Sequence, residues 1–354
     1  MNIPFVDLAR QFRGIESELT QVFLDVGRSG MYIMGEKLES FERKSAKFCG
    51  VKHAIGVADG SDALFLILKA LEIGPGDEVI TATNSFIASA WVIVAVGAKP
   101  VLVDVAEDFT IDPQKIEGAI TPRTKAIIPV HLTGRPAAMD EINGIAERYG
   151  LKVVEDAAQA IGANYRGRRV GSLGIAAGFS LHPLKNLSVY GDGGLITTND
   201  SRLDAKLRLL RNHGLRNRDE CEIWGYNSRL DTLQAAFAEI KLAKLDVWNH
   251  RCREIASSYR DGLSAYVQVP VDQPWEECVY HNFVIRTGQR DELMAYLKEK
   301  GVETRIHYPI PIHLQDAASD LGYRQGDFPN AELYALTMIS LPIYPELTDN
   351  EVSH

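Results

Sequence analysis

Short apolar runs alternate with helical patterns along most of this chain, and this alternation limits its possible folds more than any other feature. Strand-like runs occur at 78–83, 99–105, 125–132 and 152–158, and helical patterns occur at 63–71, 89–98 and 139–150. Strands that alternate with helices of this length form βαβ units around a mostly parallel, buried sheet. We therefore expect an α/β fold with a central sheet.

The second half of the chain indicates a change of architecture. Two further strand candidates, in 178–182 and 194–199, flank a glycine-rich loop that carries Lys185. A helical stretch from Leu230 through Tyr259 should lead out of this first unit. It is followed by a strand at 278–287 and a helix at 290–302, as in a small α+β domain. We expect a large domain over 1–246 and a small C-terminal domain over 247–354.

Charge and cysteine content narrow the classes of partner. The 354-residue chain has a formal net charge of −9 and no cluster of five or more basic residues, so neither nucleic acid nor an anionic membrane is the expected partner. Its four cysteines are far apart and form no CxxC pair, so we expect no metal site and no disulfide framework. No signal peptide or membrane-spanning segment is visible. We expect a cytoplasmic protein that acts on small molecules.

Four places at strand ends carry candidate ligand residues, since open α/β sheets bind ligands there. Gly60 and Ser61 begin a helix, where free N–H groups and a hydroxyl could hold a phosphate or serve only as a cap. Glu155 and Asp156 close an apolar strand. A carboxylate there could pair with a cationic ring nitrogen, or belong to a surface turn or helix cap.

The other two places offer an aromatic ring, a hydroxyl and an amine. Phe86 could cover a planar ligand or pack in the core. Ser180 lies five residues before Lys185, which could point into water or form a Schiff base. Pyridoxal 5'-phosphate is the cofactor that would use all four places, because it has an aldehyde, a ring nitrogen, a flat ring and a phosphate.

The chain resembles the DegT/DnrJ/EryC1/StrS family of sugar aminotransferases, from "PFVDLARQ" near its start to "SLPIYPELTDNEV" near its end. The resemblance implies a fold of the aspartate-aminotransferase type (fold type I) and pyridoxal 5'-phosphate as cofactor. It also implies glutamate as amino donor and an obligate homodimer with two shared active sites.

Three motifs imply roles in holding the cofactor. "DGSDAL" resembles the family's phosphate loop "NGTDAL", with Ser61 in place of threonine. The intact "EDAAQ" gives Asp156 the ring nitrogen and Gln159 a hydrogen bond to the ring hydroxyl, while Phe86 matches the aromatic residue that stacks on the ring. "FSLHPLKNL" resembles "FSFxxxKNL", which makes Ser180 a phosphate ligand and Lys185 the Schiff-base lysine.

Two further segments imply contacts with the neighbouring subunit and with substrate. "GYNSRLDTLQAA" resembles the segment that crosses the dimer, so Asn227 would contact the neighbour's cofactor phosphate and Arg229 the substrate. A solvated or intrasubunit Arg229 stays open. "ETRIHYPIPIHLQ" resembles the loop that lines the substrate pocket, where His307, Tyr308 and His313 contact substrate or simply pack.

The N-terminal "SGMYIMGEK" departs from the family's "GxxIxGPE", because Glu36 stands where proline is common. The path of the 29–37 loop and any role of Tyr32 are left open by this departure.

The activity implied is conversion of a keto sugar to an amino sugar, in the biosynthesis of cell-surface polysaccharide or deoxyamino sugars. Lysine at 185 favours transamination, since relatives with histidine there are dehydratases. "GDGG" together with "NSRLD" favours amination at C3 of a nucleotide-linked 3-keto sugar, but "LHPLKNLSV" departs from the C3 group. Amination at C4, a sugar without a nucleotide, and a cofactor-binding regulator without turnover stay open. A nicotinamide dehydrogenase is not expected, because no GxGxxG is present.

Overall fold

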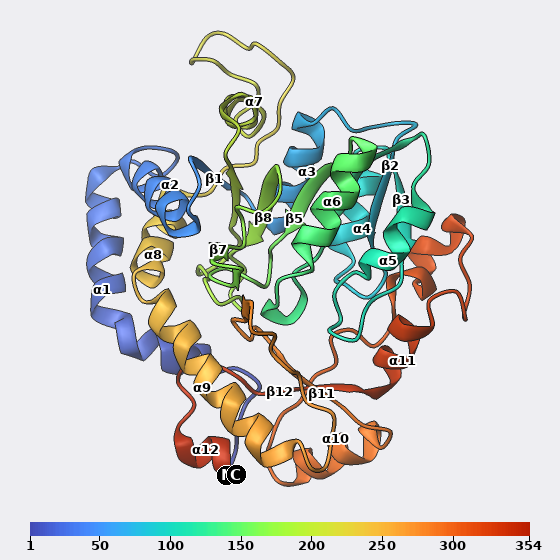
Figure 1. Ribbon diagram of the computed structural model, residues 1–354. Coiled ribbons are helices and arrows are strands. Elements are labelled where there is room, and N and C mark those ends of the chain that lie inside the picture. The colour runs from blue at the N-terminus through green and yellow to red at the C-terminus, as the bar shows by residue number, and fades with distance from the viewer.

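A seven-stranded sheet forms the centre of the computed structural model, which describes residues 1–354 (Figure 1). The strands lie in the order β1-β9-β8-β5-β4-β2-β3. They span His53–Val57 (β1), Glu78–Ala82 (β2), Lys99–Val103 (β3), Thr124–Ile128 (β4), Lys152–Asp156 (β5), Ala176–Ser180 (β8) and Gly194–Thr198 (β9). Only β9 runs antiparallel to its neighbours, and the other adjacent pairs are parallel. The expected mostly parallel sheet is confirmed.

Helices cover both faces of this sheet, because successive strand residues point into two different cores. In β2, Val79 belongs to a core with α3, α4 and α7, and Ile80 belongs to a core with α2, α6 and α8. These helices span Glu36–Cys49 (α2), Gly60–Ala70 (α3), Ala88–Ala95 (α4), Met139–Tyr149 (α6), Ser201–Leu210 (α7) and Thr232–Leu242 (α8). With both faces covered, the strand ends are the places where a ligand can enter the sheet.

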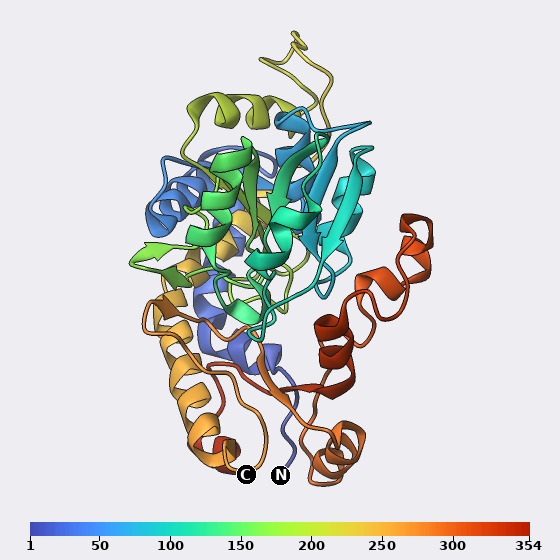
Figure 2. The same ribbon diagram turned by 45° about the vertical axis from the view of Figure 1, so that its right-hand side comes forward.

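A smaller lobe lies below this large lobe in Figures 1 and 2 and is built mainly from the C-terminal part of the chain. Its elements are α9 (Leu245–Leu263), β11 (Phe283–Arg286), α10 (Arg290–Glu299), α11 (Pro329–Thr337), β12 (Met338–Leu341) and α12 (Asp349–Ser353). Strands β11 and β12 are antiparallel and share a third core with α9 and α10. The start of the chain joins this core through Ile3, which pairs with Val302. The boundary between residues 246 and 247 stays a prediction, and it falls within α9.

The remaining elements of the chain are short, apart from α1. They are α1 (Leu8–Ser29), α5 (Pro113–Ile116), β6 (Asn164–Tyr165), β7 (Arg168–Arg169), β10 (Glu276–Glu277) and 3-10 turns at Glu117–Ala119, Leu132–Gly134, Ile312–Leu314 and Asp316–Leu321. Helices α1 and α2 and strand β1 were not expected. No helix in the structure has both the length and the apolar character needed to cross a membrane.

The expectation of one helical stretch from Leu230 through Tyr259 is wrong, because the chain breaks there into α8 and α9. The break falls at Ala243 and Lys244. It lets α8 pack against the large lobe's core while α9 packs against the third core. No glycine or proline marks this break, so the reason for it is tertiary.

Candidate active site

A cavity of about 600 Å³ opens at the carboxyl ends of β5 and β8, where the large lobe meets a loop of the small lobe. Predicted residues that line it are Gly60, Ser61, Phe86, Asp156, Gln159, Ser180, Lys185, His307 and Tyr308. Apart from Asn227, the structure therefore brings every predicted cofactor residue to one place.

The start of α3 forms one end of the cavity. Asp59 caps this helix, and its Oδ1 accepts hydrogen bonds from the backbone N–H groups of Ser61 at 2.7 Å and Asp62 at 2.9 Å. Gly60 lets the helix start lie against the end of β8, since a Cβ there would sit 2.7 Å from the Cβ of Ser180. The hydroxyls of Ser61 and Ser180 are left to bind an anion together with the positive end of the helix dipole.

The two carboxylates at the end of β5 point to opposite sides, as successive strand residues do. Glu155 is fully buried, and its oxygens accept hydrogen bonds from the backbone N–H groups of Gly171, Leu173 and Gly174. Asp156 instead faces the cavity. Of the two candidates, Glu155 is therefore structural, and Asp156 is the one available to a ligand.

Asp156 is held in place by groups of the large lobe. Its Oδ2 accepts a hydrogen bond from the Ser89 hydroxyl at 2.6 Å, and its Oδ1 accepts one from the backbone N–H of Ala158 at 3.2 Å. Gln159 is oriented as well, because its Oε1 accepts from the Thr133 N–H at 2.7 Å and its Nε2 donates to the Tyr308 hydroxyl at 3.3 Å. Both side chains are fixed before any ligand arrives.

Lys185 lies on the loop between β8 and β9, and its backbone N–H donates to the carbonyl of His182 at 2.8 Å. Burial lowers the pKa of its amine from 10.5 to about 8, while the charge of Asp156 acts in the opposite direction. The lowered pKa gives Lys185 a substantial neutral fraction near pH 8. A neutral amine is the form that attacks an aldehyde and accepts a proton.

Aromatic rings close the side of the cavity nearest the small lobe. Phe86 is 55% exposed, and its ring centroid lies 5.8 Å from that of Tyr308. The His307 Nδ1 is hydrogen-bonded to the Ser340 hydroxyl at 2.9 Å. Burial lowers the pKa of His307 to about 4, and the nearby Lys185 adds to this effect. His307 is therefore neutral at pH 7.

Three predicted residues do not line this cavity. Asn227 is exposed, and Arg229 donates from its Nη1 to the Asn212 Oδ1 at 3.1 Å. His313 was expected to contact substrate, but its side chain is fully buried. Its Nδ1 is hydrogen-bonded to the Thr83 hydroxyl at 2.8 Å and its Nε2 to Glu332 at 3.0 Å. This geometry makes His313 a link between Thr83, the residue after β2, and Glu332 of the small lobe, with no ring nitrogen free for a ligand.

Several lining residues were not identified from the sequence. His281 lines the cavity, and burial together with Lys185 and His307 holds its pKa well below the ordinary range. Its segment was interpreted only as a strand, so nothing in the pattern singled it out. Asp62, Ser89 and Trp91 also line the cavity and lie within or beside motifs that were identified.

Glu36, which stands where the family commonly has proline, lies at the start of a helix. Glu36 is the first residue of α2, and Gly35 before it has a φ of 93°. Proline and glutamate are both favourable at a helix start, the first by its fixed φ and the second by its charge. Tyr32 is 57% exposed and donates to the Gly27 carbonyl at 3.3 Å, away from the cavity lining.

The cavity fits pyridoxal phosphate on its own geometry. The amine of Lys185 matches the aldehyde, the fixed carboxylate of Asp156 matches the ring nitrogen, and the exposed ring of Phe86 matches a flat ligand. The α3 start and the hydroxyls of Ser61 and Ser180 match the phosphate. Fold and cavity together define the class: a pyridoxal-phosphate-dependent enzyme of fold type I.

Comparison with known proteins identifies the family within this class. The chain belongs to the DegT/DnrJ/EryC1/StrS aminotransferase family, whose characteristic sequence matches residues 14–354. It is therefore a pyridoxal-phosphate-dependent aminotransferase.

Curated relatives cover nearly the whole chain. It is 49% identical over 352 residues to dTDP-3-amino-3,6-dideoxy-alpha-D-galactopyranose transaminase of Aneurinibacillus thermoaerophilus, covering 99% of this chain and 96% of the relative. It is 46% identical over 348 residues to dTDP-3-amino-3,4,6-trideoxy-alpha-D-glucose transaminase of Streptomyces venezuelae, covering 98% and 92%. A pleiotropic regulatory protein of Geobacillus stearothermophilus is 45% identical over 356 residues, covering 99% and 96%.

Solved structures agree with this assignment. The crystal structure of S. venezuelae DesV matches with a TM-score of 0.98 at 46% identity, covering 99% of this chain and 96% of that one. The structure of NtdA from Bacillus subtilis with bound cofactor PMP matches with a TM-score of 0.93 at 33% identity, covering 99% and 83%. The predicted fold type, activity and cofactor are thereby confirmed.

Proposed function

We propose that this aminotransferase moves an amino group from glutamate to C3 of a nucleotide-linked 3-keto sugar, in the biosynthesis of cell-surface polysaccharide or deoxyamino sugars. Two of the relatives are named as transaminases of dTDP-linked 3-amino sugars. The observation that carries the proposal is Lys185, an amine of lowered pKa that shares one cavity with Asp156. Glutamate as donor rests on the family resemblance.

The residues of the cavity divide the chemistry between them. When bound, pyridoxal phosphate supplies an electron-withdrawing ring that stabilises charge on the carbon that loses a proton. Lys185 Nζ carries that proton between the reacting carbons, because its pKa of about 8 allows both uptake and release near neutral pH. Asp156, fixed by Ser89, places a negative charge where the ring nitrogen would be held protonated.

His307 and Tyr308 are the proposed sugar contacts. Both line the cavity from the small-lobe loop, and His307 is neutral at pH 7 because of its lowered pKa. Neutral hydrogen-bonding groups suit a pocket that must accept both a charged amino acid and a sugar in turn. We propose that His313 supports this loop from behind through Thr83 rather than touching substrate.

We further propose a homodimer with shared sites, and charge is the main support. The cavity of one chain is lined by the carboxylates Asp59, Asp62, Asp156 and Asp192, against the single amine of Lys185. Phosphate groups of a cofactor and a nucleotide need more positive charge than this. A second chain would supply it through Arg229, and Asn227 would add a donor to the phosphate.

Two exposed apolar surfaces also fit a subunit interface, and one of them includes Trp91 of the cavity lining. Ile87, Trp91 and Val94 are 36%, 50% and 56% exposed along one side of α4. The segment 213–226 projects beyond α7 at the top of Figure 1, and its Trp224 is 94% exposed. Exposed apolar surface of this kind marks an interaction site.

Mixing two inactive variants tests the shared site. Lys185→Ala and Arg229→Ala proteins, combined in equal amounts, form about half mixed dimers, each with one complete site, so activity returns to about a quarter of wild type. No recovery after confirmed subunit exchange would show either that both residues serve the same chain's site or that Arg229 does not belong to the site.

The substrate proposal is tested with purified protein in its pyridoxamine form. Nucleotide-linked 3-keto sugars, nucleotide-linked 4-keto sugars and free keto sugars are supplied separately, and amino-sugar formation is measured by mass spectrometry. Turnover confined to the first group supports the proposal. Turnover of another group moves the assignment to C4 or to a free sugar, and none at all with intact cofactor binding supports a regulatory role.

We also propose a cytoplasmic location. The four cysteines are free, and Cys221 among them is exposed. Unpaired thiols suit a reducing compartment.

A further inference from the structure

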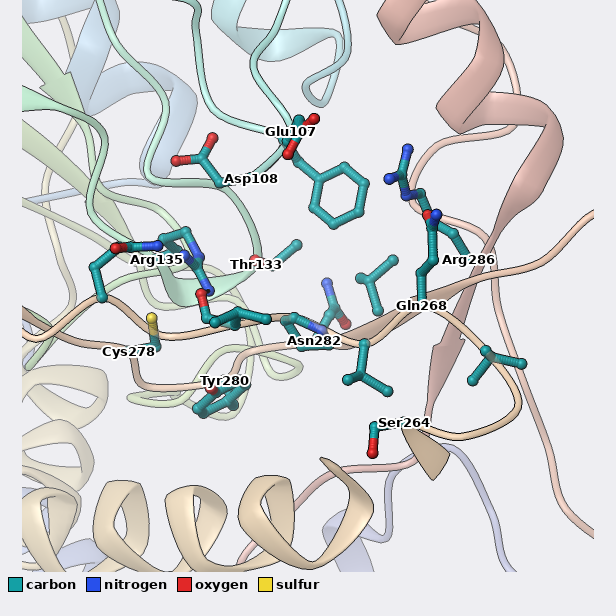
Figure 3. Close-up of a pocket in the computed structure, with 17 residues that line it drawn as sticks. Glu107, Asp108, Thr133, Arg135, Ser264, Gln268, Cys278, Tyr280, Asn282 and Arg286 are labelled. Carbon is teal, nitrogen blue, oxygen red and sulfur yellow. Dashed lines mark hydrogen bonds between the residues drawn. The ribbon is translucent and has the colours of Figure 1, made fainter. Parts of the chain in front are cut away.

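A second cavity, which the proposed function does not use, lies at the junction of the two lobes (Figure 3). Its volume is about 480 Å³, within the range of about 300–1,000 Å³ typical of small-molecule sites. Glu107, Asp108 and Phe109 come from the large lobe, and Gln268, Asn282 and Arg286 come from the small lobe. We call this cavity the junction cleft.

The small-lobe wall of the junction cleft contains one buried donor without a partner and one cation that no carboxylate neutralises. Asn282 is only 2% exposed, yet its Nδ2 makes no hydrogen bond within the chain. The Arg286 guanidinium has no carboxylate within ion-pair distance and lies over the ring of Tyr334, 4.3 Å from its centroid. An unmet buried donor costs free energy, so such groups usually have an unseen partner. Both groups favour a ligand that accepts hydrogen bonds and carries negative charge.

The large-lobe wall has the opposite charge. Glu107 forms no ion pair, and Asp108 accepts hydrogen bonds only from Thr110, at 2.9 Å and 2.8 Å. Arg135 also lines the cleft, but it pairs with Glu276 at 2.6 Å. The acidic wall is therefore free to receive a cation.

Part of the remaining lining is apolar, beside the polar residues Thr133, Ser264, Gln268 and Gln273. Phe109 and Val284 are 7% and 3% exposed, and Val267 and Val269 also line the cleft. A ligand that meets all three surfaces carries a negative group, a positive group and a small aliphatic part.

We propose that the junction cleft binds a free α-amino acid with a compact aliphatic side chain. Its carboxylate would meet Arg286 and Asn282, and its ammonium would meet Glu107 and Asp108. This inference goes beyond the proposed transamination and does not depend on it.

The junction cleft shares a wall with the cavity that Lys185 and Asp156 line, which we call the cofactor cavity. The backbone N–H of Asn282 donates to the Thr133 carbonyl at 3.2 Å, and the Thr133 N–H donates to Gln159 Oε1 at 2.7 Å. Asn282 also directly follows His281, which lines the cofactor cavity. An occupant of the cleft would thus hold the two lobes together beside Gln159.

Calorimetric titration of the cofactor-bound protein tests the proposal, with L-valine as the probe. Isobutyrate carries only the negative charge and isobutylamine only the positive charge. We expect saturable binding of valine, and we expect isobutyrate and isobutylamine to bind at least ten-fold more weakly. No saturable binding of valine at millimolar concentrations, or isobutyrate binding as tight as valine binding, would overturn the proposal.

Two pairs of variants locate the bound valine. Arg286→Gln should weaken valine binding at least ten-fold, while Arg324→Gln, at a side chain 88% exposed elsewhere on the small lobe, should not change it. Asn282→Leu should weaken binding as well, and it provides a second test if Arg286→Gln does not fold. Phe86→Ala alters the cofactor cavity and should leave valine binding intact. Loss in Phe86→Ala with retention in Arg286→Gln would place valine at the cofactor and refute the proposal.

Discussion

The cofactor cavity and the junction cleft lie on two sides of one wall, yet their polar groups are arranged differently. In the cofactor cavity, Asp156 and Gln159 are already held by protein hydrogen bonds. In the junction cleft, the Asn282 Nδ2 has no hydrogen-bond partner, and Arg286 contacts an aromatic ring but no carboxylate. Catalysis requires charges that are in position before the reaction begins, whereas reversible binding can use groups whose partner is the ligand itself. This difference is the one expected between a catalytic site and a site that binds a ligand reversibly.

The largest effect on activity is expected at Lys185, in the cofactor cavity. Lys185→Ala should lower transamination by more than about 10⁴-fold, because it removes the proposed covalent attachment and the proposed proton carrier. The fold should persist, since the side chain lies in a loop. Borohydride reduction and peptide mapping check this directly: covalently bound cofactor on any lysine other than Lys185 in the wild-type protein would refute the assignment.

Asp156 provides the next test, because it isolates charge from position. Asp156→Asn keeps the size and a hydrogen bond to Ser89 but removes the negative charge. Turnover should fall roughly 100-fold or more, the scale of losing one preorganised electrostatic contact. The cofactor should still attach to Lys185, as its absorbance would report. Near-normal turnover would show that the carboxylate has no such role.

The lowered pKa of Lys185 predicts a pH dependence in the cofactor-free protein. Its labelling by an amine-reactive reagent should be half-maximal near pH 8, since only the neutral amine reacts. Lys241 has a pKa also lowered to about 8, but it is 2% exposed and should label slowly. Peptide mapping separates the two. A half-maximum for Lys185 near pH 10.5 would contradict the effect of burial.

The lowered pKa values of Lys185 and Lys241 also predict how the free energy of unfolding changes with pH. Between about pH 8 and 10.5 these two lysines bind more protons in the unfolded chain than in the folded one. Their unfavourable contribution is therefore complete below pH 8 and disappears as the pH rises to 10.5.

The smallest effect is expected in the junction cleft. Asn282→Leu removes the buried amide while keeping a similar size, and it should raise the free energy of unfolding by roughly 1 kcal/mol in the absence of amino acids. Denaturant titration measures this change. A loss of stability would mean that Asn282 has a structural partner, and it would weaken the contrast between the two sites.

The sequence allowed the gathering of most predicted cofactor residues around one cavity to be foreseen, because their motifs are local. Asp156 ends a strand, and Gly60 and Lys185 come shortly after strands; a mostly parallel sheet brings such ends together. The positions of the other candidate residues depend on packing between segments that are distant in sequence. His313 is buried against Thr83 and Glu332, and Glu155 binds backbone amides, because of neighbours distant in sequence.

The junction cleft could not be predicted at all. Phe109, Asn282 and Arg286 come from both lobes and belong to no recognisable spacing. The absence of partners around Asn282 becomes visible only when the lobes are in place.

The antiparallel course of β9 has a consequence for the position of Lys185. Ser180 at the end of β8 pairs directly with Gly194 at the start of β9, so the loop that carries Lys185 leaves the sheet and returns to it at adjacent points. Both of its ends are anchored in the large lobe. Lys185 is therefore carried by a loop whose two ends are fixed in the large-lobe sheet, while His307 and Tyr308 reach the same cavity from the small lobe.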